Sequence, residues 1–228
     1  MCGRVRLSSD VSEIKIAFGI PPERPIPNFP PSWNAAPTDS LPVVRFDAKA
    51  AQRSLDSLRW GLLPYWAKDL NVGFANINAK AEGIEMKPAF RKAFERRRCL
   101  VPVDNFYEWK KTPTGKQPYA VALADRRIMA LAGLWENWHS PAGEWIRTFA
   151  IITTQPNELC AELHNRMPAV LKPEMWPSWL GEDAATVRDL KAMLAPYPSE
   201  GMICWPVSPR VGNVKNNDPT LIEPIAAA

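Results

Sequence analysis

Proline is the residue that most constrains how this chain can fold, because its 228 residues include 24 prolines. Each proline lacks a backbone N–H donor and has a fixed φ, so it ends or kinks a helix. This number of prolines excludes an architecture of long helices and favours short strands joined by many turns. Because 46% of the residues are apolar, the chain can still bury a sizeable core.

The pattern of apolar residues predicts short elements of both kinds. We expect helices at residues 11–20, 88–98, 156–163, 174–180 and 184–194. We expect strands at residues 41–46, 58–63, 99–103, 119–124, 128–135, 145–153 and 202–207.

Residues 125–127 predict a hairpin between the strands on either side of them. The tail from 211 to 224 is expected to be irregular but packed. Because the chain contains no repeat, low-complexity tract or linker, we expect residues 1–228 to form one α+β domain. Its sheet is expected to be strongly bent and mainly antiparallel.

Net charge and cysteine usage indicate no partner on their own. The formal net charge of +4 is too small to indicate nucleic acid from composition alone. No segment has the pattern of a signal peptide or the length of a membrane span. We therefore expect a cytoplasmic protein with no membrane partner and with reduced thiols. The cysteines are Cys2, Cys99, Cys160 and Cys204.

Cys2 has the most specific chemistry in the sequence. Methionine aminopeptidases remove Met1 when the next side chain is small, which would leave a free α-amine beside the thiol. Both groups titrate close enough to neutral pH to be nucleophilic. An aldehyde would react with this aminothiol first to an imine and then, by intramolecular attack of the thiol, to a thiazolidine ring. Alternatively, Cys2 is a terminal thiol without a function, which its position alone favours.

Two further side chains are candidates for proton transfer. Glu108 lies among Phe106, Tyr107 and Trp109, and an apolar setting suits a carboxyl group to general acid/base work. Alternatively, this segment is a core strand with Glu108 facing solvent. His164, two residues before Arg166, is either an acid/base group or part of a helix C-cap.

A metal site has little support in the sequence. Cys160 and His164 are four residues apart and would share a helix face, but zinc needs two more ligands. Cys99, Cys204 and His139 contain no local ligand pair. We therefore expect no metal and no cofactor, with Cys99, Cys160 and Cys204 as buried structural thiols.

Basic and aromatic residues occur next to these candidates. The densest basic run, residues 91–98, is most simply the solvated face of an amphipathic helix. Other cations and rings could form a site for single-stranded DNA, with cations for phosphates and rings for base stacking. They are Arg4, Arg6, Trp60, Tyr65, Trp66, Lys80 and Arg166.

Six short segments occur in an order that resembles the SRAP family, the SOS-response-associated peptidases or abasic-site processing proteins. They are MCGR at 1–4, WNAAP at 33–37, WGLLP at 60–64, NAKAE at 78–82, FYEW at 106–109 and HNRMP at 164–168. Val207 and Ser208 with the Asn-rich tail complete the pattern. Each segment is weak alone, but six in order, with cysteine at position 2, are specific and cover essentially the whole chain.

The resemblance implies a single α+β domain with a barrel-like sheet core, flanked by short helices. It also implies a groove for single-stranded DNA that contains abasic sites. After Met1 removal, the protein would form a thiazolidine DNA–protein crosslink in the DNA damage response, with lyase-type chemistry. The peptidase name would reflect self-removal of Met1. We expect a monomer that is cytoplasmic, and nucleoid-associated if bacterial.

The resemblance also assigns roles to individual residues. Cys2 would be crosslinked to the abasic sugar, and Asn78 would hold the ring-opened sugar. Glu108 would move protons, and His164 would act on the sugar hydroxyl and in reversal. The residues implied to line the DNA path are Arg4, Asn34, Trp66, Lys80 and Arg166.

The chain departs from the family pattern at three positions. Lys80 stands where the family usually has arginine, and it can meet a phosphate but without a bidentate fork. Gly83 replaces a threonine, and Asn165 replaces an aspartate beside His164. Two other functions stay open: an N-terminal-nucleophile hydrolase in which Cys2 attacks amide bonds, and a non-catalytic reader of modified or single-stranded DNA.

Overall fold

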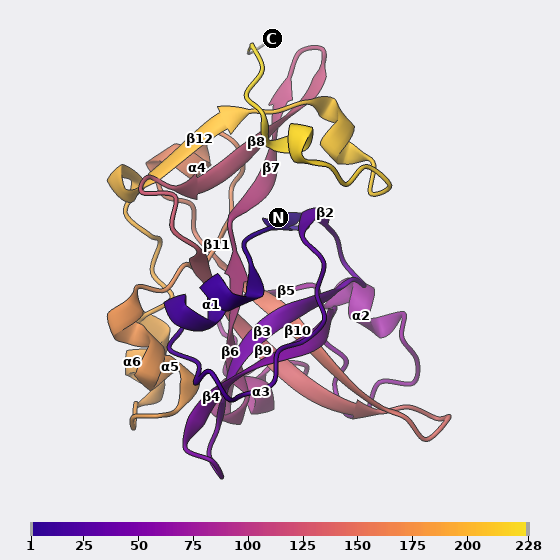
Figure 1. Ribbon diagram of the computed structural model, residues 1–228, viewed down its shortest axis with the longest axis vertical. Helices are drawn as coiled ribbons and strands as arrows, with labels where there is room; N and C mark the ends of the chain where they lie inside the picture. The colour runs from indigo at the N-terminus through magenta and orange to yellow at the C-terminus, as the bar shows by residue number, and fades with distance from the viewer. Residues whose placement is uncertain (1, 227–228) are drawn as a thin grey trace.

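The computed structural model describes residues 2–226, and its strands form two sheets (Figure 1). The smaller sheet has the strand order β12-β8-β7-β1-β2. Its strands are β1 (Val5–Leu7), β2 (Ser32–Ala35), β7 (Asn105–Thr112), β8 (Gly115–Leu123) and β12 (Met202–Pro206). The larger sheet contains β3 (Ser40–Asp47), β4 (Gln52–Trp60), β5 (Asn78–Lys80), β6 (Arg98–Val103), β9 (Met129–His139), β10 (Trp145–Thr154) and β11 (Met167–Pro168).

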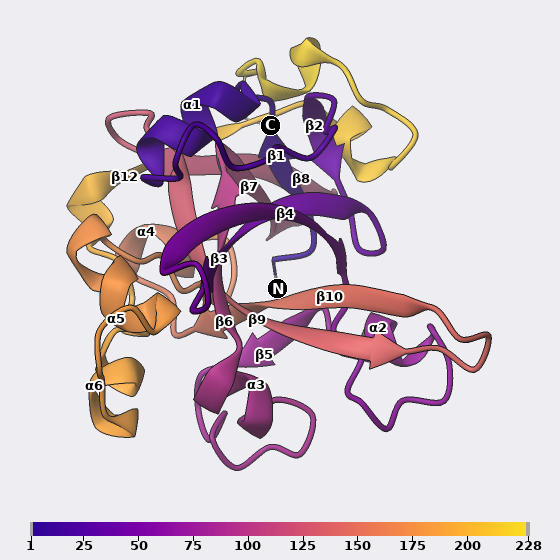
Figure 2. The same cartoon turned by 60° about the horizontal axis from the view of Figure 1, so that its bottom comes forward.

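The larger sheet closes into a barrel. Its strands pair in the order β10-β4-β3-β6-β9, and β9 pairs with β10 as well, so the ring is complete. In Figure 2, β3 and β4 curve over one side, and β9 and β10 lie on the other. β10 runs parallel to β4 and β5, whereas its pairs with β9 and β11 are antiparallel. The expected α+β fold with a barrel-like, mainly antiparallel sheet is confirmed.

Alternation along the strands divides the apolar side chains between two cores. In β6, Cys99 and Val101 belong to a core that both sheets share, whereas Leu100 belongs to a second core. The short helices cover this second core, for example through Phe94 and Trp179. Close approach also needs glycine at one point, because a Cβ atom at Gly133 would lie 2.9 Å from the Cys99 Sγ.

The helices are short, as the prolines predict. They are α1 (Val11–Ala17), α2 (Val72–Ala75), α3 (Arg91–Arg96), α4 (Glu158–Ala161), α5 (Trp176–Leu180) and α6 (Val187–Ala192). The 3-10 turns are η1 (Pro173–Met175), η2 (Ser199–Gly201), η3 (Pro209–Gly212) and η4 (Pro219–Ile222). Among residues 2–226, none of the helices has the length and apolar character that a membrane crossing requires.

Most predicted elements overlap an observed one, but the hairpin at residues 125–127 is wrong. β8 pairs with β7 and β12, whereas β9 pairs with β6 and β10, so these residues link two different sheets. Of the expected strand at 58–63, only residues 58–60 are in a strand, as the end of β4, and residues 78–80 form β5, which the apolar pattern did not predict. The tail is packed as expected, with Val211 and Leu221 fully buried.

Candidate active site

Cys2 lies in the core that the two sheets share, and its side chain has no exposed surface. Its core contains Val5 of the smaller sheet and Phe149 of the barrel. Burial raises the pKa of the Cys2 thiol well above its ordinary value, and the nearby carboxylate of Glu108 raises this pKa further. The thiol is therefore neutral around pH 7, contrary to the expectation of a thiol that titrates near neutrality.

Strand β1 brings Cys2 to this position. It pairs with β2 on one side and β7 on the other. The Tyr107 N–H donates to the Arg4 carbonyl at 2.9 Å. If this antiparallel register is continued by one residue pair toward the N-terminus, Glu108 lies next to the chain end that carries Cys2.

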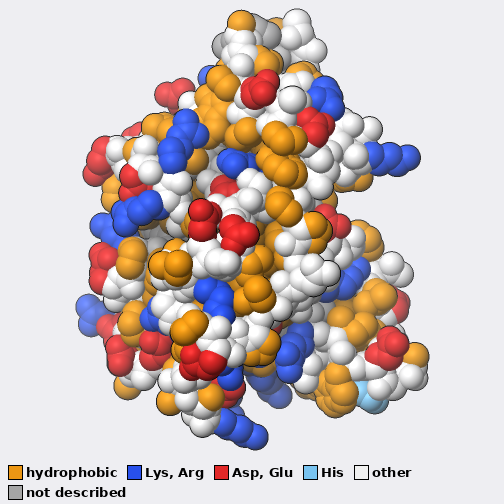
Figure 3. Space-filling view, in the orientation of Figure 1, with side chains coloured by type: hydrophobic (Ala, Val, Ile, Leu, Met, Phe, Trp, Pro, Cys, Tyr) orange, Lys and Arg blue, Asp and Glu red, His pale blue; other side chains and the backbone are white. Residues whose placement is uncertain are grey.

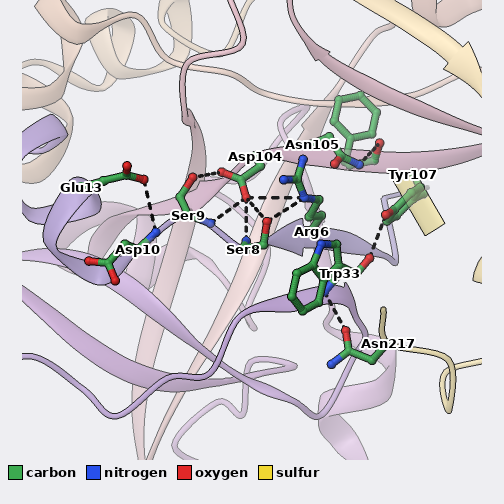
Figure 4. A network of polar contacts seen from close by, with 11 residues as sticks. Arg6, Ser8, Ser9, Asp10, Glu13, Trp33, Asp104, Asn105, Tyr107 and Asn217 are labelled. Atoms are coloured by element: carbon green, nitrogen blue, oxygen red, sulfur yellow. Dashed lines mark hydrogen bonds and ion pairs between the residues drawn. The ribbon is translucent and has the colours of Figure 1, made fainter. Parts of the chain in front are cut away.

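Figure 4 shows the polar contacts that fix β1 and its neighbours. The Asp104 carboxylate accepts hydrogen bonds from the backbone N–H groups of Ser8 at 2.6 Å and Ser9 at 3.0 Å. On the other side of β1, the Tyr107 hydroxyl donates to the Trp33 carbonyl at 2.8 Å. These contacts hold the segment that follows Cys2 against both of its neighbouring strands.

Glu108 is buried in β7, with 5% of its surface exposed. Its Oε1 accepts a hydrogen bond from the Trp109 N–H at 3.3 Å. The alternative in which Glu108 faces solvent is therefore wrong, and the carboxyl group lies in the apolar setting that its neighbours in the sequence predict. Its electrostatic influence reaches both Cys2 and Cys160.

Asn78 and Lys80 point to the same side of β5, because side chains alternate along a strand. Asn78 is opposite Ile151 of β10. Its Nδ2 makes only a long contact of 3.5 Å to the Ile151 carbonyl. Among residues 2–226, its buried Oδ1 has no hydrogen-bond partner. Lys80 at the end of the strand is exposed.

Arg166 is buried and held by a carboxylate. Its Nη1 and Nη2 donate to the two oxygens of Glu82 at 2.6 and 2.9 Å, and Nη2 also donates to the Thr153 carbonyl. The guanidinium of Arg166 lowers the pKa of Glu82 to about 2. Because Thr153 pairs with Lys80, Arg166 lies next to Lys80. Both terminal nitrogens of Arg166 are, however, already bound to Glu82.

His164 lies two residues after Glu162, the C-cap residue of α4. The His164 N–H donates to the Cys160 carbonyl at 2.9 Å. Its Nδ1 accepts from the Arg166 N–H at 3.1 Å. Because Nδ1 is an acceptor, a neutral imidazole carries its proton on Nε2.

Arg4 is tied to the C-terminal segment through Asn34. Its Nη1 donates to the Asn34 Oδ1 at 2.8 Å and to the Val211 carbonyl at 2.7 Å. The Asn34 Nδ2 donates to the carbonyls of Asn213 at 3.0 Å and Asn216 at 2.8 Å. Asn34 is buried, so its amide positions Arg4 rather than facing solvent. The sequence pattern did not indicate that the tail reaches this site.

The aromatic candidates separate into buried and exposed residues. Trp60 is fully buried, stacks on Phe149 and donates to the Ile77 carbonyl at 2.9 Å. The prediction that Trp60 stacks on bases is therefore wrong. Tyr65 and Trp66 lie in the loop after β4 and are 65% and 50% exposed.

On the face drawn in Figure 3, Lys and Arg side chains are interspersed with Asp and Glu and form no continuous basic surface. Arg6 bonds to Ser8 at 2.8 Å and lies 3.8 Å from Asp104. Within the run at 91–98, residues 91–96 form the amphipathic helix α3, with Phe94 buried and Lys92 exposed, whereas Arg98 begins β6.

The cysteines are free thiols, and Cys99 and Cys160 are buried as expected. Burial raises the pKa of the Cys160 thiol to about 12, with smaller effects of Cys204 and Glu108. Within the described part of the chain, no group of three or more His, Cys, Asp and Glu side chains could hold a metal ion. The site thus offers a thiol, a carboxyl group, an imidazole and an amide, all from the chain itself.

Comparisons with known proteins agree on one family. The model of the family described as SOS response associated peptidase (SRAP) matches residues 1–214. The abasic site processing protein YoqW of Bacillus subtilis (strain 168) is 41% identical over 224 residues, which cover 98% of this chain and 99% of that protein. The abasic site processing protein HMCES of Gallus gallus is 32% identical over 227 residues, covering 86% of this chain and 67% of that protein.

The fold also has a close match among solved structures. A crystal structure of a protein from Bacteroides thetaiotaomicron superposes with a TM-score of 0.88 at 24% sequence identity. The match covers 98% of this chain and all of that one. This likeness shows that the fold is shared.

Proposed function

The chain belongs to the SRAP family, and from this premise we propose that it processes abasic sites in single-stranded DNA by covalent attachment through Cys2. Relatives named abasic site processing proteins support the substrate class. The observation that carries the chemistry is the position of Cys2, which is held between the two sheets beside the buried Glu108. Met1 lies outside the described residues, and its removal is part of the proposal.

The crosslink forms in two balanced steps. The Cys2 amine attacks the C1′ aldehyde of the ring-opened sugar, and the carbinolamine loses water to give an imine. The thiol then adds to the imine carbon, its proton passes to the imine nitrogen, and a thiazolidine ring results. One water is released in total, and no oxidant or reductant is needed. Because amine and thiol belong to one residue, the second step is intramolecular and favoured.

The buried, neutral thiol assigns a task to Glu108. A thiol whose pKa is raised by burial adds slowly unless a nearby group takes its proton. The Glu108 carboxyl group is beside Cys2 and can transfer protons to and from the carbinolamine and the thiol. Its buried setting strengthens this effect, since no bulk water competes for the proton.

Asn78 and His164 act on the sugar in this proposal. The Asn78 Oδ1, which is buried and has no partner among residues 2–226, accepts a hydrogen bond from a sugar hydroxyl. The His164 imidazole, whose Nδ1 accepts from the Arg166 N–H, assists opening of the sugar and reversal of the ring. If the imine undergoes β-elimination before the ring closes, the strand breaks, which is the lyase-type activity.

The DNA path follows the cations and rings around these groups. In this proposal the exposed Lys80 and the partly buried Arg4 contact phosphates, and Arg166 joins them once its fork is released from Glu82. A base stacks on Trp66, which is half-exposed. Asn34 contributes by holding Arg4. We further propose that the chain acts as a monomer and removes its own Met1.

The test is the intact mass of the protein after incubation with a single-stranded oligonucleotide that contains one abasic site. We expect the mass of the chain without Met1 plus the oligonucleotide, minus one water, in the absence of any reducing agent. Cys2→Ser should lose the stable adduct, and an undamaged oligonucleotide should give none. Full crosslinking by a chain that retains Met1 would refute the aminothiol mechanism.

A further inference from the structure

The basic residues before and within α3 lie next to the candidate DNA path through contacts that the proposed function leaves unexplained. The Lys87 Nζ donates to the Lys80 carbonyl at 3.2 Å, so the Lys87 side chain lies against the backbone of Lys80. Further along, the Lys92 Nζ lies 4.7 Å from the centre of the Tyr65 ring. Lys87 and Lys92 therefore connect Lys80 at the end of β5 with the exposed ring of Tyr65.

The connection is a consequence of how α3 begins. The carbonyl of Lys87 accepts from the N–H groups of Phe90 at 2.9 Å and Arg91 at 2.8 Å, which fixes Lys87 to the first turn of the helix. Phe94 is buried in the core, so the opposite side of α3 is directed to solvent. Lys92 is on that side and reaches across to the loop after β4.

Most carboxylates near this line of cations are already paired. Glu82 is bound to Arg166, Glu85 to Lys191, and Glu95 to Arg96. Asp69 in the loop accepts from the backbone N–H of Asn71 at 2.7 Å. In contrast, the described residues place no carboxylate in an ion pair with Lys80, Lys87 or Lys92. The charge of Lys87 lowers the pKa of Glu85, but this carboxylate is bound to Lys191 and offsets the charge of the line only in part. The line thus carries a net positive charge.

We propose that Lys87 and Lys92 form a phosphate track, which leads a single strand from Lys80 at the crosslink site to the rings of Tyr65 and Trp66. This inference rests on the proposed function and extends its DNA path beyond the residues of the family pattern. Phosphates lie along the three lysines, and a base stacks on Tyr65, whose ring is 65% exposed. Lys92, which lies against that ring, joins the phosphate contacts to the stacking contact.

The test compares equilibrium binding of an undamaged, fluorescently labelled oligothymidylate at increasing salt. Each phosphate contact on a single strand contributes about 0.7 to the slope of log affinity against log salt. The double variant Lys87→Ala/Lys92→Ala should therefore have a slope that is shallower by about 1.4, with affinity about tenfold lower at low salt. Its crosslinking rate at saturating abasic DNA should equal that of the wild type.

Arg96→Ala is the matched control, because Arg96 is on the same helix and equally cationic but is paired with Glu95 and 75% exposed at its side chain. It should leave the slope unchanged. An unchanged slope in the double variant, or an equal change in Arg96→Ala, would overturn the track. If the wild type binds the undamaged strand but does not crosslink to abasic DNA, the proposed function fails, while the slopes still decide the track.

Discussion

Asn34 shows how a single amide can act on chemistry that it does not touch. Its Oδ1 accepts from Arg4, and its Nδ2 donates to the carbonyls of Asn213 and Asn216. All of these contacts are inside the protein, so Asn34 is a positioning residue for Arg4. The tail from η3 onward is thereby part of the site, although it contributes no reacting group.

This role predicts a non-additive pair of variants. Asn34→Ala and Arg4→Ala should each lower the crosslinking efficiency at limiting DNA by about tenfold, and the double variant should be no worse than Arg4→Ala alone, because residues in one network share their effect. Asn217→Ala removes the hydrogen bond that the Trp33 N–H donates to the Asn217 Oδ1. This variant controls for general loosening of the tail. The measurement is the crosslinking rate at limiting and saturating DNA. Independent, multiplied losses would show that Asn34 acts without Arg4.

Glu82 provides a second test at this scale. Its carboxylate is half-exposed and occupies the guanidinium fork of Arg166. Glu82→Gln should lower stability, because it leaves the buried guanidinium of Arg166 without its carboxylate, and it should strengthen DNA binding several-fold by freeing Arg166 for a phosphate. Thermal denaturation and an oligonucleotide titration measure the two effects. Weaker binding would instead mean that the carboxylate holds Arg166 in its working position.

The same pair has a defined pH dependence. Arg166 lowers the pKa of Glu82 from the ordinary 4.5 to about 2. The contribution of this pair to the free energy of unfolding is therefore fully present above pH 4.5 and is lost as the pH falls through about 2.

The sequence predicted which residues could carry the proposed chemistry but not how deeply each is buried. Trp60 and Trp66 lie in one short segment, yet Trp60 is inside the core and Trp66 is half-exposed. The difference arises because Trp60 ends β4 and faces Phe149 of β10, and that neighbour is distant in sequence. The burial of Cys2 has the same cause, since it depends on both sheets closing around the chain end.

Among the secondary-structure elements, β1 is the one that sets the position of Cys2. It is only three residues long, too short to be recognised from periodicity, and its register depends on β7 and on Asp104. Asp104 accepts from the N–H groups of Ser8 and Ser9 and from the Ser9 hydroxyl at 2.5 Å. This three-residue strand is therefore stabilised by the side chain of Asp104, which lies between β6 and β7.

Removing this clamp should slow the chemistry as well as weaken the fold. Asp104→Ala leaves two backbone N–H groups without their acceptor, which costs about 1–3 kcal/mol, and it should lower the crosslinking rate because β1 positions Cys2. Asp10→Ala is the matched control, since Asp10 directly follows Ser8 and Ser9 in sequence but caps α1 by accepting from the Ser12 N–H, and it should weaken the fold without slowing the reaction. Denaturant unfolding and crosslinking time courses separate the two effects. An unchanged rate in Asp104→Ala would show that β7 alone fixes β1.

The long strands were predictable because their pattern is local. β9 and β10 are buried along most of their length, and apolar runs at 128–135 and 145–153 predicted them. Pairing is not local, which is why residues 125–127 were misread as a hairpin. Arg126 adopts a positive φ there, as a tight turn would, but the chain passes from one sheet to the other.

At the scale of the whole molecule, the shared core makes stability depend on groups that must stay protonated. Burial raises the pKa of the thiols of Cys2 and Cys99 above the ordinary 9.0. Burial also raises the pKa of Tyr107 from 10.0 to about 12. In the unfolded chain these groups ionise at their ordinary values. The folded protein therefore binds more protons than the unfolded chain once the pH exceeds 9.0.

Linkage then fixes the sign of the pH dependence. Because these values are raised in the folded state, the associated stability is fully present below the unfolded pKa and is lost as the pH rises toward the folded one. The free energy of unfolding should be nearly constant from about pH 7 to 8 and should fall beyond about pH 9, by about 1.4 kcal/mol per buried thiol for each further pH unit. Tyr107 adds to the loss between its unfolded value of 10.0 and its folded value of about 12.

Urea unfolding at a series of alkaline pH values, with a reducing agent present, measures the slope. Cys99→Ala should show a shallower alkaline slope than the wild type, whatever its stability at neutral pH. A free energy of unfolding that stays constant through pH 10 would mean that the core admits water to these thiols, and the neutral Cys2 that gives Glu108 its proposed task would be lost with it.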